Sequence, residues 1–201
     1  MKLREGMLVK VCGVANIDDA VFASRLGADI IGVVLDPTIP RHGDTDLVTD
    51  IHRSGIRVAG VYTSLESALG RNLDEDLIQL HFPHDGETVE YVKNETGKEV
   101  ISVIQYSETN GLSDEARARY SAGADIVLIE NRNGMITTLD RIAEIQKIVR
   151  TGISGRISPG NALEFARINP LMIDLSSSLE LYPGKKDPSL VSELFRNLEV
   201  A

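Results

Sequence analysis

The sequence predicts an α/β fold, a barrel of eight parallel strands that alternate with helices, and three observations support this prediction. Its 201 residues match one ordinary domain and are about the fewest from which such a barrel is built. Eight short apolar, β-branched runs begin 19 to 27 residues apart, which suits strand–helix units rather than hairpins. Several runs are apolar on both faces, as parallel strands covered by helices are. We therefore predict a single (β/α)8 TIM-barrel domain over residues 1–201.

The eight runs are the predicted strands, and the segments between them are predicted to be mostly helical. In chain order the strands are expected at Val9–Val14, Ile30–Leu35, Arg57–Thr63, Leu77–His81, Glu99–Ile104, Asp125–Glu130, Gly152–Gly155 and Leu171–Ser176. The first helix is expected at Ile17–Leu26, with Asn16 as its cap and Gly27 at its end. Another helix is expected to start where Ser158 precedes Pro159.

Two further patterns support the prediction of eight alternating strands and helices. The last helix is predicted by an apolar stripe at Leu190, Val191, Leu194, Phe195 and Leu198. Gly27-Ala28-Asp29-Ile30 recurs as Gly123-Ala124-Asp125-Ile126, each time at the entry to a predicted strand. The copies lie 96 residues apart, or four mean periods, which places them at strands two and six of an eight-unit barrel.

Composition excludes several classes of function. A net charge of −9 opposes binding to a phosphate backbone, so nucleic acid is not expected as a partner. The purest apolar stretch, Ile30–Leu35, has six residues where a membrane span needs about twenty. No long apolar region follows Met1–Leu8, so we expect no secretory signal and a cytoplasmic protein. The single cysteine, Cys12, cannot form an internal disulfide.

Polar residues gather where the predicted strands end, which is where barrels of this kind carry their sites. They are Cys12, Asp36, Arg41, Gln79, His81, Glu130, Ser154, Gly155, Arg156, Asp174 and Ser176–Ser178. Because side chains alternate along a strand, Lys10 shares a face with Cys12, and Asp174 shares one with Ser176. If both faces point inward, strand eight closes beside strand one and Lys10 forms a buried ion pair with Asp174.

Two smaller groups suggest ligands. His81 and His84 lie three residues apart, but Pro83 between them opposes a helical presentation, so we expect no metal site. In the last quarter, Ser154–Ile157 leads toward a predicted helix, and Ser176–Ser178 can open another short one. Free backbone N–H groups of Gly155, Arg156 and Ile157 and of Ser176, Ser177 and Ser178 are expected to converge on a phosphate.

An ordered set of segments, spanning about residues 9 to 198, carries a family resemblance. They are Lys10–Gly13, the Gly-Ala-Asp entry to strand two, Pro37–Arg41, Leu77–His81, Asp174–Ser177 and Pro183–Asp187. Together they resemble the phosphoribosylanthranilate isomerase family of tryptophan biosynthesis. The resemblance implies one (β/α)8 barrel that takes a small phosphorylated substrate and uses no metal or organic cofactor.

The implied reaction is the Amadori rearrangement of N-(5-phosphoribosyl)anthranilate to 1-(2-carboxyphenylamino)-1-deoxyribulose 5-phosphate. An acid protonates the ribose ring oxygen and opens the ring to an iminium. A base then takes the proton from carbon 2 to give an enolamine, which tautomerises to the ketone. By resemblance Cys12 is the base and Arg41 binds the anthranilate carboxylate, with Gln79, His81 and Asp174 also facing the substrate. The family's acid, an Asp ending strand six, corresponds here to Glu130.

These roles carry electrostatic expectations. Partial burial is expected to raise the pKa of Glu130, which must donate a proton, and a nearby cation is expected to favour the Cys12 thiolate. Cys12 and Glu130 are expected to face one pocket from opposite sides of the barrel. If Glu130 is not the acid, Asp36 is the next candidate.

The sequence also departs from the family pattern. Asn131–Gly134 replaces a glycine-rich loop, Arg156 and Ser178 stand where the family has glycines, and Phe82 follows His81 in place of Gly. A positive φ at Arg156 or Ser178 is expected to be strained. Two alternatives therefore stay open: a phosphate-binding barrel with lost or altered activity, and an isomerase of another phosphosugar. Either is expected as a monomer or homodimer.

Overall fold

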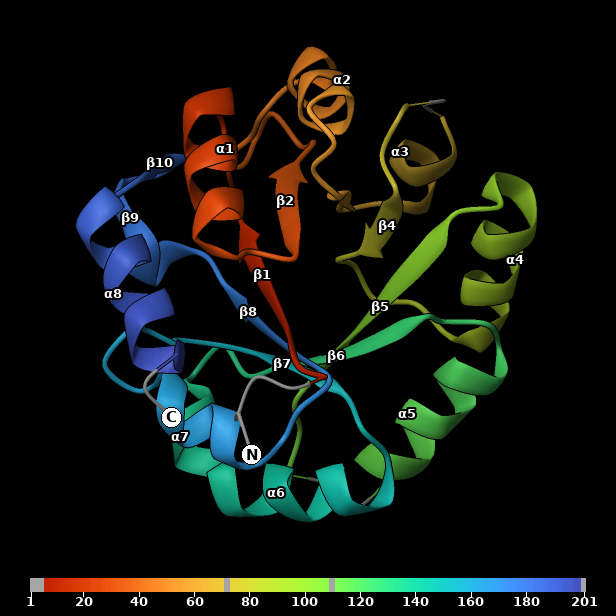
Figure 1. The fold of residues 1–201 in the computed structure, drawn as a ribbon. Coiled ribbons are helices and arrows are strands. Elements are labelled where there is room, and N and C mark those ends of the chain that lie inside the picture. Colours follow the sequence, from red (N-terminus) through yellow and green to blue (C-terminus); the bar gives the residue numbers. More distant parts are fainter. Residues whose placement is uncertain (1–5, 71–72, 109–110, 200–201) are drawn as a thin grey trace.

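Eight parallel strands close into a barrel in the computed structural model, which describes residues 6–70, 73–108 and 111–199 (Figure 1). They are β1 (Leu8–Cys12), β2 (Ile30–Val34), β3 (Val58–Tyr62), β4 (Leu77–Leu80), β5 (Glu99–Gln105), β6 (Ile126–Glu130), β7 (Gly152–Ser154) and β8 (Met172–Leu175). Each strand pairs with the next, and β8 pairs with β1. The predicted fold class is confirmed, and every strand ends within two residues of its predicted bounds.

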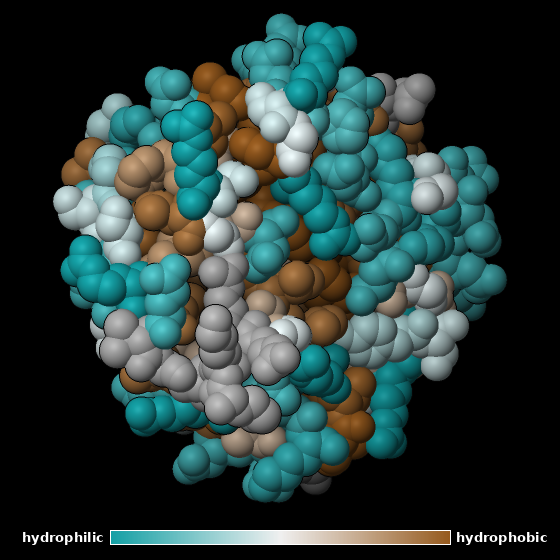
Figure 2. All heavy atoms as spheres, in the orientation of Figure 1, coloured by the Kyte–Doolittle hydropathy of each residue, from teal (hydrophilic) through white to brown (hydrophobic). Residues whose placement is uncertain are grey.

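Helices surround the barrel (Figure 1). They are α1 (Ile17–Leu26), α2 (Thr45–Arg53), α3 (Leu65–Leu69), α4 (Gly86–Thr96), α5 (Leu112–Ser121), α6 (Leu139–Ile148), α7 (Ala162–Arg167) and α8 (Pro188–Glu199). Two short 3₁₀ helices, η1 (Met135–Thr138) and η2 (Ser177–Leu179), and a hairpin of β9 (Glu180–Tyr182) and β10 (Lys185–Lys186) complete the described elements. The outer surface of α4, at the right of Figure 2, is hydrophilic, as a solvent-facing helix surface should be.

Local sequence accounts for both ends of α1 as predicted. The Asn16 side chain accepts a hydrogen bond from the Asp19 amide, and Gly27 ends the helix in the left-handed region at φ 115°. The predicted apolar stripe also forms the inner face of α8, where Val191 and Leu194 are fully buried.

The predicted helix start at Pro159 is wrong, because α7 begins at Ala162. The Ser158 amide donates to the Asn161 side chain, and the Asn161 amide donates back to the Ser158 carbonyl. This reciprocal pair holds a turn in front of the helix, and the Asn161 side chain competes with helical bonding in the way short polar residues do.

The Gly-Ala-Asp repeat has the same structural role in both places. At the entry to β2, the Asp29 carboxylate accepts from the Val9 amide at 2.8 Å, and the Asp29 amide donates to the Val9 carbonyl. At the entry to β6, Asp125 makes the same two contacts with Val100 of β5. Each aspartate therefore aligns its own strand with the preceding one, and the copies do precede strands two and six.

Apolar side chains fill two layers around the strands. The barrel interior holds a cluster that includes Ile30, Leu77, Ile101, Leu128 and Met172, all almost fully buried. A larger cluster fills the space between the strands and the helices. The interior cluster packs one end of the barrel and leaves the carboxyl ends of the strands for polar side chains.

No helix in the described part of the chain is long and apolar enough to cross a membrane. Residues 1–5, on which the expected lack of a secretory signal partly rests, lie outside the described residues.

Candidate active site

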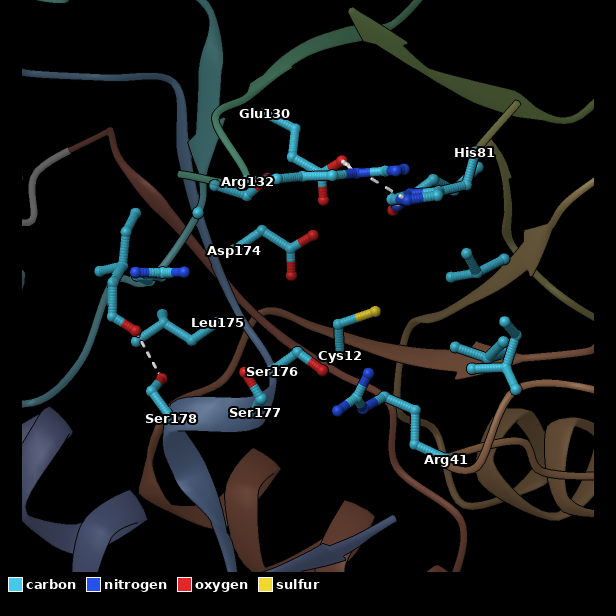
Figure 3. A pocket seen from close by; sticks show the side chains of 18 of the residues that line it. Cys12, Arg41, His81, Glu130, Arg132, Asp174, Leu175, Ser176, Ser177 and Ser178 are labelled. Atoms are coloured by element: carbon cyan, nitrogen blue, oxygen red, sulfur yellow. Dashed lines mark hydrogen bonds and ion pairs between the residues drawn. The ribbon is translucent and has the colours of Figure 1, made fainter. Parts of the chain in front are cut away.

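A cavity of about 590 Å³ lies at the carboxyl ends of the strands and is lined by all twelve predicted site residues. They are Cys12, Arg41, Gln79, His81, Glu130, Gly155, Arg156, Ile157, Asp174, Ser176, Ser177 and Ser178. Figure 3 shows Cys12 and Glu130 entering from different elements, with Asp174 between them. The structure therefore brings together residues from four strands, β1, β4, β6 and β8, and from the loops that follow β2, β4, β7 and β8.

The predicted buried ion pair is present below the cavity. Lys10 is fully buried, and its Nζ lies 3.0 Å from Asp174 Oδ2. The two residues are direct partners in the β1–β8 pairing, so the closure of the barrel brings them together. The other carboxylate oxygen, Asp174 Oδ1, is buried with no hydrogen-bond partner in the described structure. A ligand donor in the cavity would satisfy it.

Glu130 ends β6 and is held by three side chains, all at Oε2. Gln105 donates at 2.6 Å, Arg132 Nε donates at 3.1 Å, and His81 Nε2 lies 3.6 Å away. Figure 3 shows Arg132 and His81 on either side of the Glu130 carboxylate at the cavity wall. A carboxylate with several donors and a cation beside it is stabilised in its ionised form.

The expected rise in the pKa of Glu130 is therefore wrong, whereas the cation expected to favour the Cys12 thiolate is present but does not decide the net pKa of the thiol. Burial does act to raise the pKa of Glu130, but His81, Gln105 and Arg132 outweigh it and the net pKa is lowered. For Cys12, burial raises the pKa of the thiol more than Lys10 lowers it, so the net pKa is raised. In the unliganded protein Glu130 is the ionised group and Cys12 the protonated one.

Arg41 meets an unpredicted partner. Its Nε and Nη2 donate to the two oxygens of Glu180 at 3.1 and 3.2 Å, a bidentate pairing that fixes the guanidinium plane. Lys186, almost fully buried, reaches the same carboxylate at 3.1 Å and also donates to the Cys12 carbonyl at 2.7 Å. The two cations hold the pKa of Glu180 below its usual range despite its burial.

The two predicted phosphate loops face each other across the cavity. The Ser178 hydroxyl donates to the Ile157 carbonyl, which joins the loop after β7 to η2 (Figure 3). Arg156 has φ 53°, so the expected strained left-handed conformation is confirmed there. Ser178 lies inside η2 and is not among the residues with positive φ. The first turn of such a helix leaves backbone N–H groups without intrahelical partners.

The loop after β6 is packed tightly on the loop after β7. Gly155 has φ 123°, and a Cβ there would lie 2.0 Å from the Asn131 carbonyl oxygen, so only glycine fits. The Asn131 amide donates to Ser154, and the Met135 amide donates to Gly155. The Asn131–Gly134 segment is thus a short turn braced by backbone hydrogen bonds.

Two other candidates have structural roles. His84 hydrogen-bonds to the Phe82 carbonyl and, at 2.8 Å, to the buried Ser102 hydroxyl. Asp36 accepts from the amide and hydroxyl of Thr38 and from Thr63, and these bonds lower its pKa, so it is a poor proton donor. Within the described ranges, no group of three or more potential metal ligands comes together.

Sequence reasoning missed Arg132, Gln105, Glu180 and Lys186. The position of Arg132, two residues after Glu130, was a usable signal, because both follow the same strand end. No sequence signal indicated Glu180, because it lies 139 residues from Arg41, the residue that it contacts.

Comparison with known proteins gives a consistent result. A sequence model of the family described as N-(5'-phosphoribosyl)anthranilate isomerase matches residues 9–197. The N-(5'-phosphoribosyl)anthranilate isomerase of Thermoplasma volcanium is 40% identical over 197 residues, 97% of each chain.

Solved structures are similar over the same length. The phosphoribosyl anthranilate isomerase of Thermus thermophilus has a TM-score of 0.80 at 24% identity and covers 96% of this chain and 98% of that one. A phosphoribosyl anthranilate isomerase in complex with reduced 1-(o-carboxyphenylamino)-1-deoxyribulose 5-phosphate has a TM-score of 0.77 at 23% identity, with 97% and 100% covered. These similarities show the fold.

Proposed function

Because the chain belongs to the N-(5'-phosphoribosyl)anthranilate isomerase family, we propose that it catalyses the Amadori rearrangement of N-(5-phosphoribosyl)anthranilate, with Cys12 as base and Glu130 as acid. The observation that carries this proposal is the cavity that Cys12 and Glu130 share, with the Gly155–Ile157 and Ser176–Ser178 turns at one end and an apolar, arginine-flanked wall at the other. A substrate with a phosphate at one end and an aromatic carboxylate at the other matches both ends.

The phosphate end lies between the loop after β7 and η2. Gly155, Arg156 and Ile157 line one side and Ser177 and Ser178 the other. Backbone N–H groups at the start of a helical turn favour anions, and the Arg156 guanidinium adds a charge-assisted donor. Sequence and geometry both support phosphate as the group bound there.

The aromatic end is formed by an apolar wall. Val34 and Val61 pack together with Cys12, and Ile39 packs against them. Arg41 lies beside this wall and lines the cavity with them. An anthranilate ring on the wall would bring its carboxylate to Arg41, whose fixed guanidinium plane suits a carboxylate.

The proton transfers set the order of events. Glu130 must first carry a proton, which it gives to the ribose ring oxygen as the ring opens. The Cys12 thiolate then takes the proton from carbon 2, and tautomerisation of the enolamine gives the ketone. The low pKa of Glu130 means that only a fraction of the unliganded protein has the acid in its active form.

The test is turnover of freshly prepared substrate, followed by loss of its anthranilate-type fluorescence. Cys12→Ser and Glu130→Gln are each expected to lower turnover by about two or more orders of magnitude, the scale of a lost acid or base. Glu130→Asp restores the residue of the family pattern and should retain activity if the loop after β6 lets the shorter carboxyl reach the ring oxygen. A folded protein with no turnover across pH favours a phosphate-binding barrel without this activity, and near-normal turnover in Glu130→Gln rejects the assignment of the acid.

Growth of a tryptophan auxotroph that lacks the isomerase is the test in a cell, because rescue excludes a purely binding role. We infer the cytoplasm as the place of this reaction and a monomer or homodimer as its form, which sedimentation would distinguish. Turnover of a different phosphosugar with none of the anthranilate substrate would support the other alternative.

A further inference from the structure

We propose that Lys10 is a positioning residue that stabilises the Cys12 thiolate, because its buried ammonium lies between the thiol and Asp174. Lys10 has no role in the proton transfers described above. The inference rests on the proposed function only in that Cys12 is the base, and its central measurement does not require turnover.

The geometry places one cation between two acidic groups. Lys10 and Cys12 lie on β1 two residues apart, so both side chains point into the barrel. A Cβ built on Gly32 of β2 would lie 2.7 Å from Cys12 Sγ and 2.9 Å from Lys10 Nζ. Cys12 Sγ and Lys10 Nζ therefore both lie against Gly32, which has no side chain and so leaves room for them.

The charged groups around the thiol come from three strands. Lys10 of β1 and Lys186 of β10 are cations, and Asp174 of β8 is the anion. Lys10 has the larger favourable effect of the two cations on the thiolate, whereas Asp174 and burial both oppose thiolate formation. Arg41 approaches the next residue, Gly13, from the other side.

Lys10 itself stays protonated. Burial acts against its charge, but Asp174 and Cys12 outweigh burial, and the net pKa of Lys10 is raised. An ammonium without a free lone pair cannot attack a carbonyl, so the geometry does not suit a Schiff-base lysine. The proton from carbon 2 ends on Cys12 Sγ, and Lys10 keeps its own protons throughout.

Removal of Lys10 and removal of the Asp174 charge should shift the pKa of Cys12 in opposite directions. Without Lys10, only the weaker effect of Lys186 opposes burial and Asp174, so the pKa of Cys12 rises. Without the charge of Asp174, the pKa falls. A purely structural role for Lys10 predicts no such opposite shifts, since disruption of the pair from either side would loosen the same packing.

The experiment measures the Cys12 thiol directly. Cys12 is the only cysteine in the chain, so thiolate absorbance and the rate of alkylation by iodoacetamide report this residue without background. We would titrate the parent, Lys10→Met, Asp174→Asn and the double variant, with Cys12→Ser as the blank. Lys185→Met is the matched control, because it removes a neighbouring lysine that pairs with Asp19 instead.

In Lys10→Met, alkylation below the thiol pKa should slow by about tenfold for each unit by which the pKa rises, since the thiolate is the nucleophile. At neutral pH kcat/KM should fall by the same factor, because only the thiolate can take the proton. In Asp174→Asn the titration should move to lower pH. In the double variant the pKa of Cys12 should rise less than in Lys10→Met. If Lys10→Met alone does not fold, the double variant can still be titrated.

An unchanged thiol titration in Lys10→Met and in the double variant would overturn the proposal, as would shifts of the same sign in Lys10→Met and Asp174→Asn. Failure of the proposed function looks different. In that case the parent shows no turnover, or Cys12→Ser retains it, while the alkylation profiles still report whether Lys10 controls the thiol.

Discussion

Replacement of Arg132 with Gln should make the protein faster at high pH. Arg132 Nε lies 3.1 Å from Glu130 Oε2 and is one of the groups that lower the pKa of this carboxyl. The Arg132 side chain is 68% exposed and that of Glu130 is 17% exposed, so solvent screens much of their attraction. Two charges about 4 Å apart interact by about 1 kcal/mol in water, so we expect the pKa of Glu130 to rise by about 0.7.

The sign follows from the role of an acid. Glu130 donates only when protonated, so the rate depends on its protonated fraction. Above the pKa of Glu130 this fraction should rise about fivefold when the pKa rises by about 0.7, so the variant should be about fivefold faster than the parent at neutral and higher pH. Initial rates of fluorescence loss across pH measure this. Arg117→Gln on α5 is the control, because it removes an exposed arginine away from the cavity. A rate at neutral pH that is unchanged or lower in the variant would refute the reasoning.

Two other predictions concern stability. Gly155→Ala should lower the free energy of unfolding by more than about 2 kcal/mol, since its Cβ would collide with Asn131, whereas Gly97→Ala, at φ 67° with nothing within 4 Å, should lower it by about 1 kcal/mol. Equal losses in chemical denaturation would contradict the close approach. Glu180→Gln should destabilise by about 3 kcal/mol, because the ammonium of Lys186 stays buried without its anion. The pKa of Glu180 is lower when folded, so this contribution is present above its unfolded pKa and is lost as pH falls through the folded value; a parent–variant difference that persists in acid would reject this origin.

Much of the fold could be predicted because it depends on local pattern. β-Branched runs locate the strands, and their even spacing favoured, over an open sheet, a barrel in which strand eight closes on strand one. Lys10 and Asp174 were predictable as a pair once both faces were taken to point inward, because the register then places them together. The start of α7 was not predictable, because the Asn161 side chain competes with the helix for local hydrogen bonds.

The positions of the site residues were predictable, but their protonation was not. The carboxyl ends of parallel strands meet, so a polar residue after each strand reaches the same cavity. The pKa of Glu130 depends instead on Gln105 from a neighbouring strand and on Arg132, whose distances from Oε2 no sequence pattern gives. For Cys12, the sequence indicated the cation but not that burial outweighs it.

The turn at Asn131–Gly134, which backbone hydrogen bonds hold in place, limits the length of the sugar phosphate that can react in the cavity. Backbone hydrogen bonds join the segment after Glu130 to Ser154 and Gly155, so the acid and the phosphate loop keep a fixed separation. A sugar phosphate with one carbon more or fewer between its phosphate and its ring oxygen would therefore bring that oxygen to the wrong place. A misplacement of about 1 Å can lower a rate by about a hundredfold. Such homologues should occupy the cavity and yet react slowly, so the backbone, rather than any one side chain, selects among phosphosugars by their length.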